Sequence, residues 1–259
     1  MPSKRYKAIA EYYDPENAHH AMLEQDVPFF MGQLPKRPQS ILEMAVGTGR
    51  AAIPLAQAGH RVVGVDYAAD MLAIARRKRD AVGLTDRQLS LIKGDLLKLD
   101  LGRRFDWACI LFNTFLAFTS IEQQDAVLQS ALRHLKPRGR LWIDIFQPDF
   151  KLLARSSLAK VDPVAFYVPP YDRTVMKTID VRRGSTPQVQ RVTFHYVWFD
   201  EKGHEHRERT EFDMAYVFPR ELELLIERNG LRIEHLFGNY DGSPLWPESP
   251  RIIARCCRG

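Results

Sequence analysis

The feature that most constrains this chain is a glycine turn that follows an apolar segment. Residues 41–50 read Ile-Leu-Glu-Met-Ala-Val-Gly-Thr-Gly-Arg, so an apolar strand passes through Gly47-Thr48-Gly49 and enters a helical pattern. Glycine has no Cβ, so a turn built on it lets a ligand approach the backbone closely. In open parallel sheets, ligands lie beyond the carboxyl ends of the strands. The segment therefore predicts an α/β fold with a ligand site at one edge of its sheet.

Apolar strands alternate with helical patterns over the same part of the chain, which indicates a parallel sheet. We expect strands at 40–46, 61–66, 88–93, 105–113 and 139–145, and helices that begin near Arg50, Ala69 and Glu122. In the last helix the apolar residues repeat at i, i+3, i+4 and i+7, through Leu128 to Leu135, and we expect it to end at the breakers of 136–139.

The hydrophobic pattern of the sequence changes after residue 147. Residues 173–216 alternate with a period of two, and Val192, Phe194, Tyr196 and Trp198 share one face, so we expect about three antiparallel strands with a turn at 200–203. A short helix from Pro219 and strands at 231–237 and 251–256 follow. This organisation predicts a main α/β domain at 40–147 and 217–259, an antiparallel β insertion at 148–216, and an N-terminal helical lid at 1–39.

Composition excludes several classes of protein. The 259 residues hold 37 Lys and Arg against 32 Asp and Glu, and this net charge of +5 is interleaved along the chain, so nucleic acid is permitted but not favoured as a partner. The chain has no apolar run long enough to cross a membrane and no signal-peptide pattern, and its three cysteines form no disulfide framework, so we expect a cytoplasmic protein. His204 and His206 have no third ligand near them in the sequence, so we expect no metal.

Two chemistries use a glycine turn of this kind. Residues 47–52 fit the dinucleotide pattern G-x-G-x-x-[GA], which keeps a nicotinamide oxidoreductase open. Asp66 ends the second strand seventeen residues after Gly49, where its carboxylate can accept hydrogen bonds from a ribose diol. A bound nucleoside is expected under either chemistry.

Four motifs in order resemble class I S-adenosylmethionine-dependent methyltransferases. Glu43-x-Ala45-x-Gly47-x-Gly49 resembles the first motif, with alanine at its first glycine. Residues 66–72 resemble the second, Gly94-Asp95-Leu96 the third, and residues 135–139 the turn before the fifth strand. An N-terminal Tyr12-Tyr13, the insertion and the 238–242 loop extend the resemblance to sugar N-methyltransferases and glycine/sarcosine methyltransferases.

The resemblance implies a Rossmann-like seven-stranded methyltransferase sheet with an antiparallel β insertion after strand five. It also implies S-adenosyl-L-methionine as cofactor, with the ribose on Asp66, the adenine beside Met71 and Asp95, and a tyrosine over the methionine part. The expected cofactor-binding residues are Tyr13, Glu43, Ala45, Gly47, Gly49, Asp66, Tyr67, Met71, Asp95, Leu96 and Phe112.

The expected reaction is methyl transfer to a nitrogen or oxygen atom of a small molecule. An amine acceptor needs only to arrive unprotonated, whereas a hydroxyl needs a base within hydrogen-bond reach. Candidate residues on the acceptor side are Tyr13, Asn113, His195 and Tyr240. An RNA methyltransferase, a nicotinamide oxidoreductase and a non-catalytic cofactor-binding regulator remain the alternatives.

Overall fold

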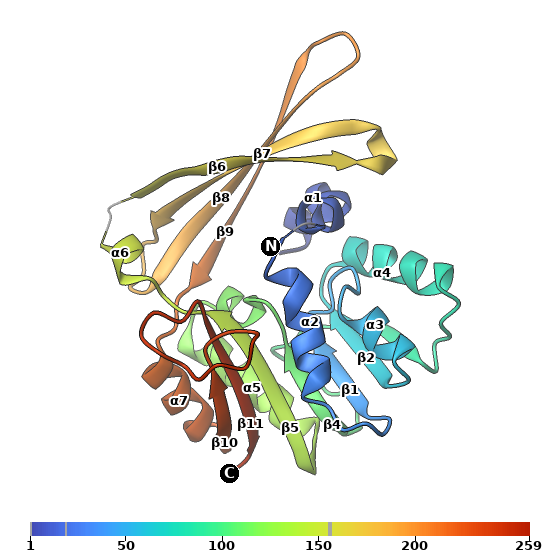
Figure 1. The fold of residues 1–259 in the computed structure, drawn as a ribbon, viewed down its shortest axis with the longest axis vertical. Coiled ribbons are helices and arrows are strands. Elements are labelled where there is room, and N and C mark those ends of the chain that lie inside the picture. The colour runs from blue at the N-terminus through green and yellow to red at the C-terminus, as the bar shows by residue number, and fades with distance from the viewer. Residues whose placement is uncertain (1, 19, 155–156) are drawn as a thin grey trace.

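The computed structural model describes residues 2–18, 20–154 and 157–259 as two sheets with helices around them (Figure 1). The elements of the first half are α1 Pro2–Asn17, α2 Leu23–Gly32, β1 Ser40–Met44, α3 Ala52–Gln57, β2 Arg61–Asp66, α4 Ala69–Ala81, β3 Leu89–Lys93, β4 Phe105–Ile110, the 3-10 helix η1 Thr114–Ala117, and α5 Ile121–Arg133. Those of the second half are β5 Leu135–Phe146, α6 Phe150–Leu153, β6 Ser157–Val168, η2 Pro169–Tyr171, β7 Arg173–Arg183, β8 Val189–Phe199, β9 Glu205–Ala215, α7 Pro219–Arg228, β10 Leu231–Phe237 and β11 Arg251–Arg258.

The larger sheet, sheet A, has seven strands in the order β10-β11-β5-β4-β1-β2-β3. Strands β1 to β5 pair in parallel, and β11 is antiparallel to both β5 and β10. Alternate residues of β1 belong to two different hydrophobic cores, because helices cover both faces of the sheet. Leu42 and Met44 lie in one core, and Ile41 lies in the other. The expected α/β fold with a seven-stranded sheet is confirmed.

The boundary between α5 and β5 differs from the expectation. The helix ends at Arg133, and Leu135 already belongs to β5, where it pairs with Phe105 of β4. The predicted helix end at 136–139 is therefore wrong. Leu135 is completely buried in the strand as it would have been in a helix, so an apolar periodicity could not tell the two apart.

The smaller sheet, sheet B, has four antiparallel strands in the order β6-β7-β8-β9, one more than expected. The sequence missed β6, whose pairing with β7 slips between Leu158 and Val164. Pro163 lies in that stretch, and proline is tolerated in a strand at a sheet edge because it has no N–H to donate. The predicted turn at 200–203 is confirmed, with Gly203 N–H donating to the Asp200 carbonyl.

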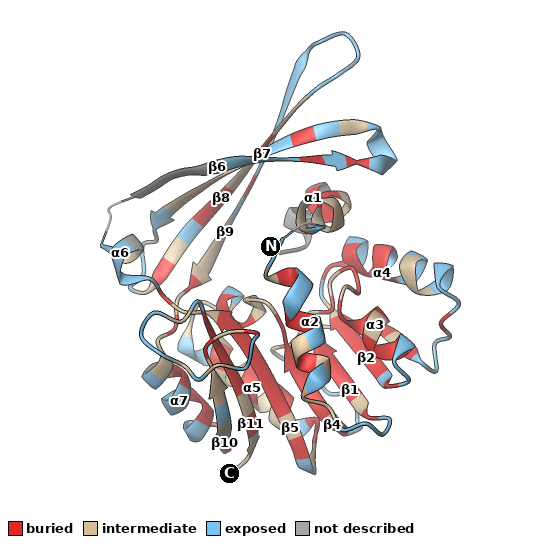
Figure 2. Cartoon of the chain, in the orientation of Figure 1, coloured by how far each residue is buried: buried red, intermediate tan, exposed pale blue. Residues whose placement is uncertain are grey.

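Helix α1 lies between the two sheets (Figure 1). Its Ile9 and Tyr12 pack on sheet B, and Ala10 packs on Met71 and Ile74 of α4. Figure 2 shows buried residues in sheet B and in α4, and a larger share of buried residues in the strands of sheet A than in those of sheet B. None of the helices in the described ranges is both long and apolar enough to span a membrane.

Candidate functional site

The loop after β1 is fixed by its own backbone at the carboxyl edge of sheet A. Both Ala45 and Val46 donate their N–H groups to the Val65 carbonyl of β2, and Gly49 N–H donates to the Val46 carbonyl. Gly47 and Gly49 have φ of +55° and +79°, which only glycine adopts without strain. Ala45 has φ of +65° at the position of the motif's first glycine, so this loop carries one strained residue.

A cavity of about 420 Å³ opens beside this loop. Eight of the eleven expected cofactor residues line it: Tyr13, Ala45, Gly47, Asp66, Tyr67, Met71, Asp95 and Leu96. The three that do not are Glu43, Gly49 and Phe112. The cavity also includes Leu97, Thr114, Ala117, Phe118 and Gln123, which the sequence analysis missed. All but Gln123, which lies in the first turn of α5, follow strands β3 and β4, so their position at the carboxyl edge was the signal that could have found them.

Two carboxylates face the cavity from neighbouring strands. Asp66 accepts hydrogen bonds from Gly47 N–H and Ala68 N–H, both at 2.8 Å, and so ties the glycine loop to the start of α4. Burial raises the pKa of Asp66 against these hydrogen bonds, which lower it. Asp95 accepts from Leu97 N–H at 3.0 Å. Each carboxylate oxygen can accept more than one hydrogen bond, so both groups can still bind a ligand.

Glu43 lies at the end of β1, on the face that packs against α2 and α3, and is 4% exposed. Its Oε2 atom is buried and has no hydrogen-bond partner within the described structure. Burial raises the pKa of Glu43 to about 8, against the lowering effect of Arg50. Arg50 is itself paired with Asp26 of α2 at 2.7 Å. A buried carboxyl oxygen without a partner fits a site that receives a cation.

Helix α1 covers the cavity with Tyr13 and is tied to the glycine loop by Asp14. The Thr48 hydroxyl donates to Asp14 Oδ1 at 2.6 Å, and Lys78 Nζ of α4 donates to Asp14 Oδ2 at 2.7 Å. Thr48 is completely buried under this contact. One turn of the helix therefore joins the loop, α4 and the cavity wall.

Asn113 and Tyr240, two of the candidate acceptor-side residues, are engaged within the fold. Asn113 Oδ1 accepts from Phe146 N–H at 2.7 Å, which clamps the end of β4 to the end of β5. Tyr240 donates its hydroxyl to Asp144 Oδ2 at 2.8 Å, and Arg251 donates to the other oxygen of Asp144. Neither Asn113 nor Tyr240 lines the 420 Å³ cavity.

Phe112 precedes Asn113 in a left-handed turn, with φ values of +41° and +67°. Its ring lies 5.0 Å from the Arg251 guanidinium and 5.9 Å from that of Arg50. Phe112 therefore packs among cations behind the loop instead of lining the cavity. Left-handed backbone at two successive non-glycine residues is strained, and such strain is characteristic of functional sites.

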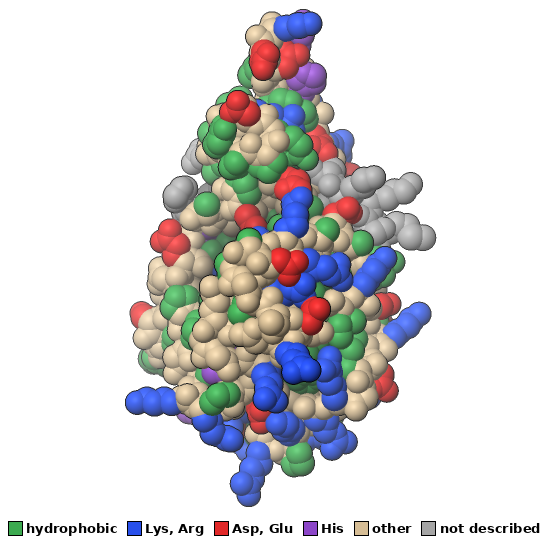
Figure 3. All heavy atoms as spheres, turned by 90° about the vertical axis from the view of Figure 1, so that its right-hand side faces the viewer, with side chains coloured by type: hydrophobic (Ala, Val, Ile, Leu, Met, Phe, Trp, Pro, Cys, Tyr) green, Lys and Arg blue, Asp and Glu red, His purple; other side chains and the backbone are tan. Residues whose placement is uncertain are grey.

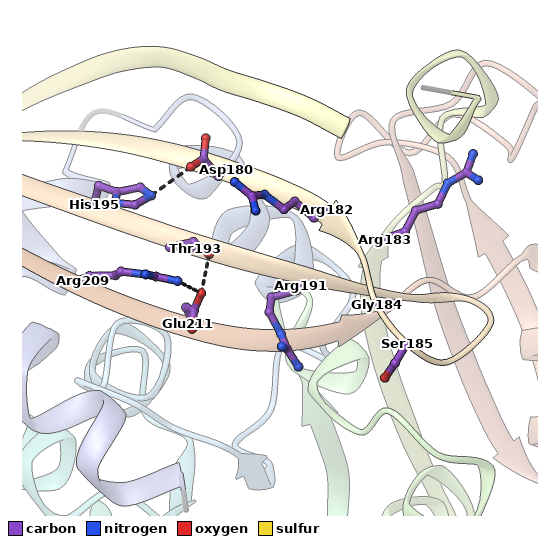
Figure 4. Close-up of a pocket in the computed structure, with 10 residues that line it drawn as sticks. All are labelled: Asp180, Arg182, Arg183, Gly184, Ser185, Arg191, Thr193, His195, Arg209 and Glu211. Carbon is purple, nitrogen blue, oxygen red and sulfur yellow. Dashed lines mark hydrogen bonds and ion pairs between the residues drawn. The ribbon is translucent and has the colours of Figure 1, made fainter. Parts of the chain in front are cut away.

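His195, the remaining candidate, lies on the outer face of sheet B (Figure 4). Its neighbour Tyr196 packs on Tyr12 of α1, and strand alternation directs His195 to the opposite side. There His195 Nε2 lies 3.0 Å from Asp180 Oδ2, in a surface depression that also contains Arg209 and Glu211. His195, expected on the acceptor side, therefore lies on the face of sheet B that is turned away from α1 and outside the lining of the 420 Å³ cavity.

Comparisons with known proteins give the class of this chain. Residues 41–139 match the family model described as a methyltransferase domain. A cypemycin N-terminal methyltransferase from Streptomyces sp is 28% identical over 83% of this chain and 81% of that protein. The CcbJ methyltransferase from Streptomyces caelestis superposes with a TM-score of 0.73 at 23% identity, over 90% of this chain and 88% of that one. A sugar N-methyltransferase from Streptoalloteichus sp gives 0.71 at 23% identity, over 98% and 93% of the two chains.

The sheet order, the glycine loop and the two carboxylates are those of a methyltransferase fold. The chain carries a methyltransferase domain in residues 41–139 and is similar to S-adenosylmethionine-dependent methyltransferases over most of its length.

Proposed function

We propose that this enzyme methylates an amino nitrogen of a small molecule. The observation that carries the proposal is the make-up of the described cavity lining, which holds no imidazole, thiol or amine and whose two carboxylates, Asp66 and Asp95, are taken by the cofactor in our assignment. Asn113, Tyr240 and His195 are held by Phe146, Asp144 and Asp180. A neutral amine needs no base to attack a methyl group, whereas a hydroxyl does. The named activities of two relatives, an N-terminal and a sugar N-methyltransferase, also involve nitrogen.

We assign cofactor binding to the residues that line the cavity, with Glu43 beneath them. Asp66 and Asp95 would accept hydrogen bonds from the ribose hydroxyls and the adenine amino group, and Met71 would pack on the adenine. Bound S-adenosylmethionine supplies an electrophilic methyl group on a sulfonium. The unpartnered oxygen of Glu43 would receive the positively charged amino group, directly or through water. Tyr13 would cover the site and exclude water from the methyl channel.

We also propose a division of labour along the chain. Residues 1–39 form the lid, residues 40–147 and 217–259 hold the cofactor, and residues 148–216 form the wall on the acceptor side. The contacts of α1 with sheet B on one side and with α4 on the other support this division. In this arrangement the chain contributes mainly by holding the amine in line with the methyl group in a dry pocket.

Paired acceptors that differ by one atom test the nitrogen assignment. Amino sugars and their hydroxyl analogues are incubated with methyl-labelled cofactor, and labelled product is measured between pH 6 and 10. We expect turnover of amines only, with a rate that rises through the pKa of the amine because only the neutral form attacks. Equal labelling of the hydroxyl analogues contradicts the proposal.

RNA is the alternative acceptor that the sequence left open. No described residue of the cavity is basic, and a protein that binds RNA through phosphates loses affinity steeply as salt rises. We therefore expect total RNA to accept no label. Methylated RNA would replace the small-molecule assignment.

A further inference from the structure

The amino ends of the five parallel strands of sheet A carry a row of cations, which we call the basic edge. At least one cation precedes each strand or lies within its first four residues, and adjacent strands lie about 4.8 Å apart. The order β3-β2-β1-β4-β5 therefore makes the row continuous. Its members are Arg87, Arg61, Lys36, Arg37, Arg103, Arg104 and Arg138, all exposed. Figure 3 shows Lys and Arg side chains gathered at this lower end of the molecule.

These seven cations have no ion-pair partner in the described parts of the chain. The nearby carboxylates are already engaged: Asp86 pairs with Arg79, and Asp106 binds Lys136 and Ser40. Asp100 accepts from Gly102 N–H. The seven charges exceed the net charge of +5, so the remaining charges of the molecule nearly cancel. The positive field is thus concentrated on one edge.

A groove of about 480 Å³ crosses the basic edge where β1, β4 and β5 begin. Pro35 and Pro137 give it apolar surface, and Arg37 and Arg138 line it. Trp107, also in its lining, is only 3% exposed. The groove combines unpaired guanidinium groups with apolar surface, as protein interfaces do.

We propose that the basic edge docks an acidic segment of another protein. Six of its seven cations are arginines. The planar guanidinium group of arginine pairs with a carboxylate through two parallel hydrogen bonds. Arginine is also enriched at protein interfaces, whereas lysine is depleted there. Nucleic acid fits less well, because Phe105 and Trp107 are buried and cannot stack on bases. The edge lies at the opposite ends of the strands from the cofactor cavity, so the docked segment is a partner and not the methyl acceptor.

A charge-reversal variant with a matched control tests the docking. Arg37→Glu, Arg104→Glu and Arg138→Glu are combined in one full-length protein, and Lys151→Glu, Lys202→Glu and Arg220→Glu in another. Both change the net charge equally, and the control residues are exposed and lie outside the edge. Binding of fluorescent poly-L-glutamate is measured by anisotropy at low and moderate salt. We expect at least a tenfold weaker affinity in the edge variant and less than a twofold change in the control.

Comparison probes separate the kinds of polyanion. Oligouridylate with the same number of charges and vesicles that contain phosphatidylglycerol are measured beside polyglutamate. Tighter binding of either probe than of polyglutamate overturns the proposal, and so does no polyglutamate binding or an equal loss in both variants. Thermal melting and binding of S-adenosylhomocysteine are expected to remain as in the wild type in both variants, which keeps this test independent of the methylation assay.

Discussion

Sheets A and B meet across one helix, but they are supported differently. Sheet A is covered on both faces, and its backbone builds the cofactor cavity. Sheet B buries one face, with Val175 and Tyr196 under α1, and its outer face carries charged residues such as Arg209 and Glu211. The cofactor region therefore draws its shape from a continuous core, whereas sheet B is held by α1 and by the contact of β9 with η1.

Helix α1 is held to sheet B and to the glycine loop by side-chain hydrogen bonds of similar kinds. Towards sheet B, Lys177 and the Tyr196 hydroxyl donate to Glu16, and Arg173 donates to the Tyr12 hydroxyl. Towards the cofactor loop, Thr48 donates to Asp14. Truncation and point substitutions can measure how much each of these contacts contributes.

Removal of residues 1–14 should have the largest effect. The lid model expects a folded protein whose turnover falls at least a hundredfold, because Tyr13 and the Asp14 tie are lost and water enters the site. Calorimetry with S-adenosylhomocysteine should show much weaker binding, and circular dichroism checks the fold. A truncated protein that melts early but binds with normal affinity would mean that α1 only packs, and Tyr13 would then leave the site.

Asp66→Ala tests the cofactor side alone. The carboxylate binds Gly47 N–H, and in our assignment also the ribose, so we expect at least a tenfold loss of affinity for S-adenosylhomocysteine. This corresponds to about 1.5–3 kcal/mol for a charged hydrogen bond. Asp70→Ala is the matched control, because Asp70 is an exposed acid on the first turn of α4, the helix that follows Asp66. Equal affinities of the two variants would assign Asp66 a structural role only.

Glu43 should make the stability of the cofactor region depend on pH. Its folded pKa of about 8 lies above the usual value of 4.5, so the folded state binds the proton more tightly. The stabilisation is complete below pH 4.5 and is lost as pH rises towards 8, by at most about 1.4 kcal/mol for each pH unit. Urea unfolding between pH 5 and 9 should show this slope in the wild type and not in Glu43→Gln.

The matched control for this slope is Glu24→Gln, which changes an exposed acid of α2. Its slope should equal that of the wild type. If Glu43→Gln keeps the full pH dependence, the proton is bound elsewhere, and Asp66, whose pKa is also raised by burial, is the next group to test.

The smallest expected effects are on the free energy of unfolding and come from two opposite substitutions in the glycine loop after β1. Ala45→Gly relieves a left-handed alanine, and Gly47→Ala creates one, since φ is positive at both positions. We expect Ala45→Gly to change the free energy of unfolding by less than about 1 kcal/mol, and Gly47→Ala to destabilise by about 1–2 kcal/mol. Chemical denaturation measures both, and a more stable Gly47→Ala would contradict the assigned strain.

Most of sheet A could be predicted because local signals and topology agree there. Apolar runs placed the parallel strands, and the glycine turn placed the loop. Asp66 was found because an acid that ends a strand beside such a turn is delivered to the same edge. The residues after β4 were missed because η1 has no periodicity of its own, although Thr114 lies only four residues after the end of β4.

The remaining features depend on tertiary neighbours. Alternation in β8 separated His195 from Tyr196, but only the packing of Tyr12 shows which face is the inner one. The basic edge escaped for a similar reason. The one cationic cluster in the sequence, 76–79, includes Arg77 and Lys78, which pair with acids of α1. The cations that gather in space are scattered along the chain.

The alternation along α1 has a consequence for changing the acceptor of such an enzyme. Tyr12 and Glu16 contact sheet B, whereas Tyr13 lines the cavity and Asp14 binds the glycine loop. The helix therefore has two separate contact surfaces. A β insertion from another enzyme could be grafted here if it kept partners for Ile9, Tyr12 and Glu16 and the contact of β9 with η1. The cofactor half would then be reusable without redesign, and new acceptors could be sought by exchanging one sheet.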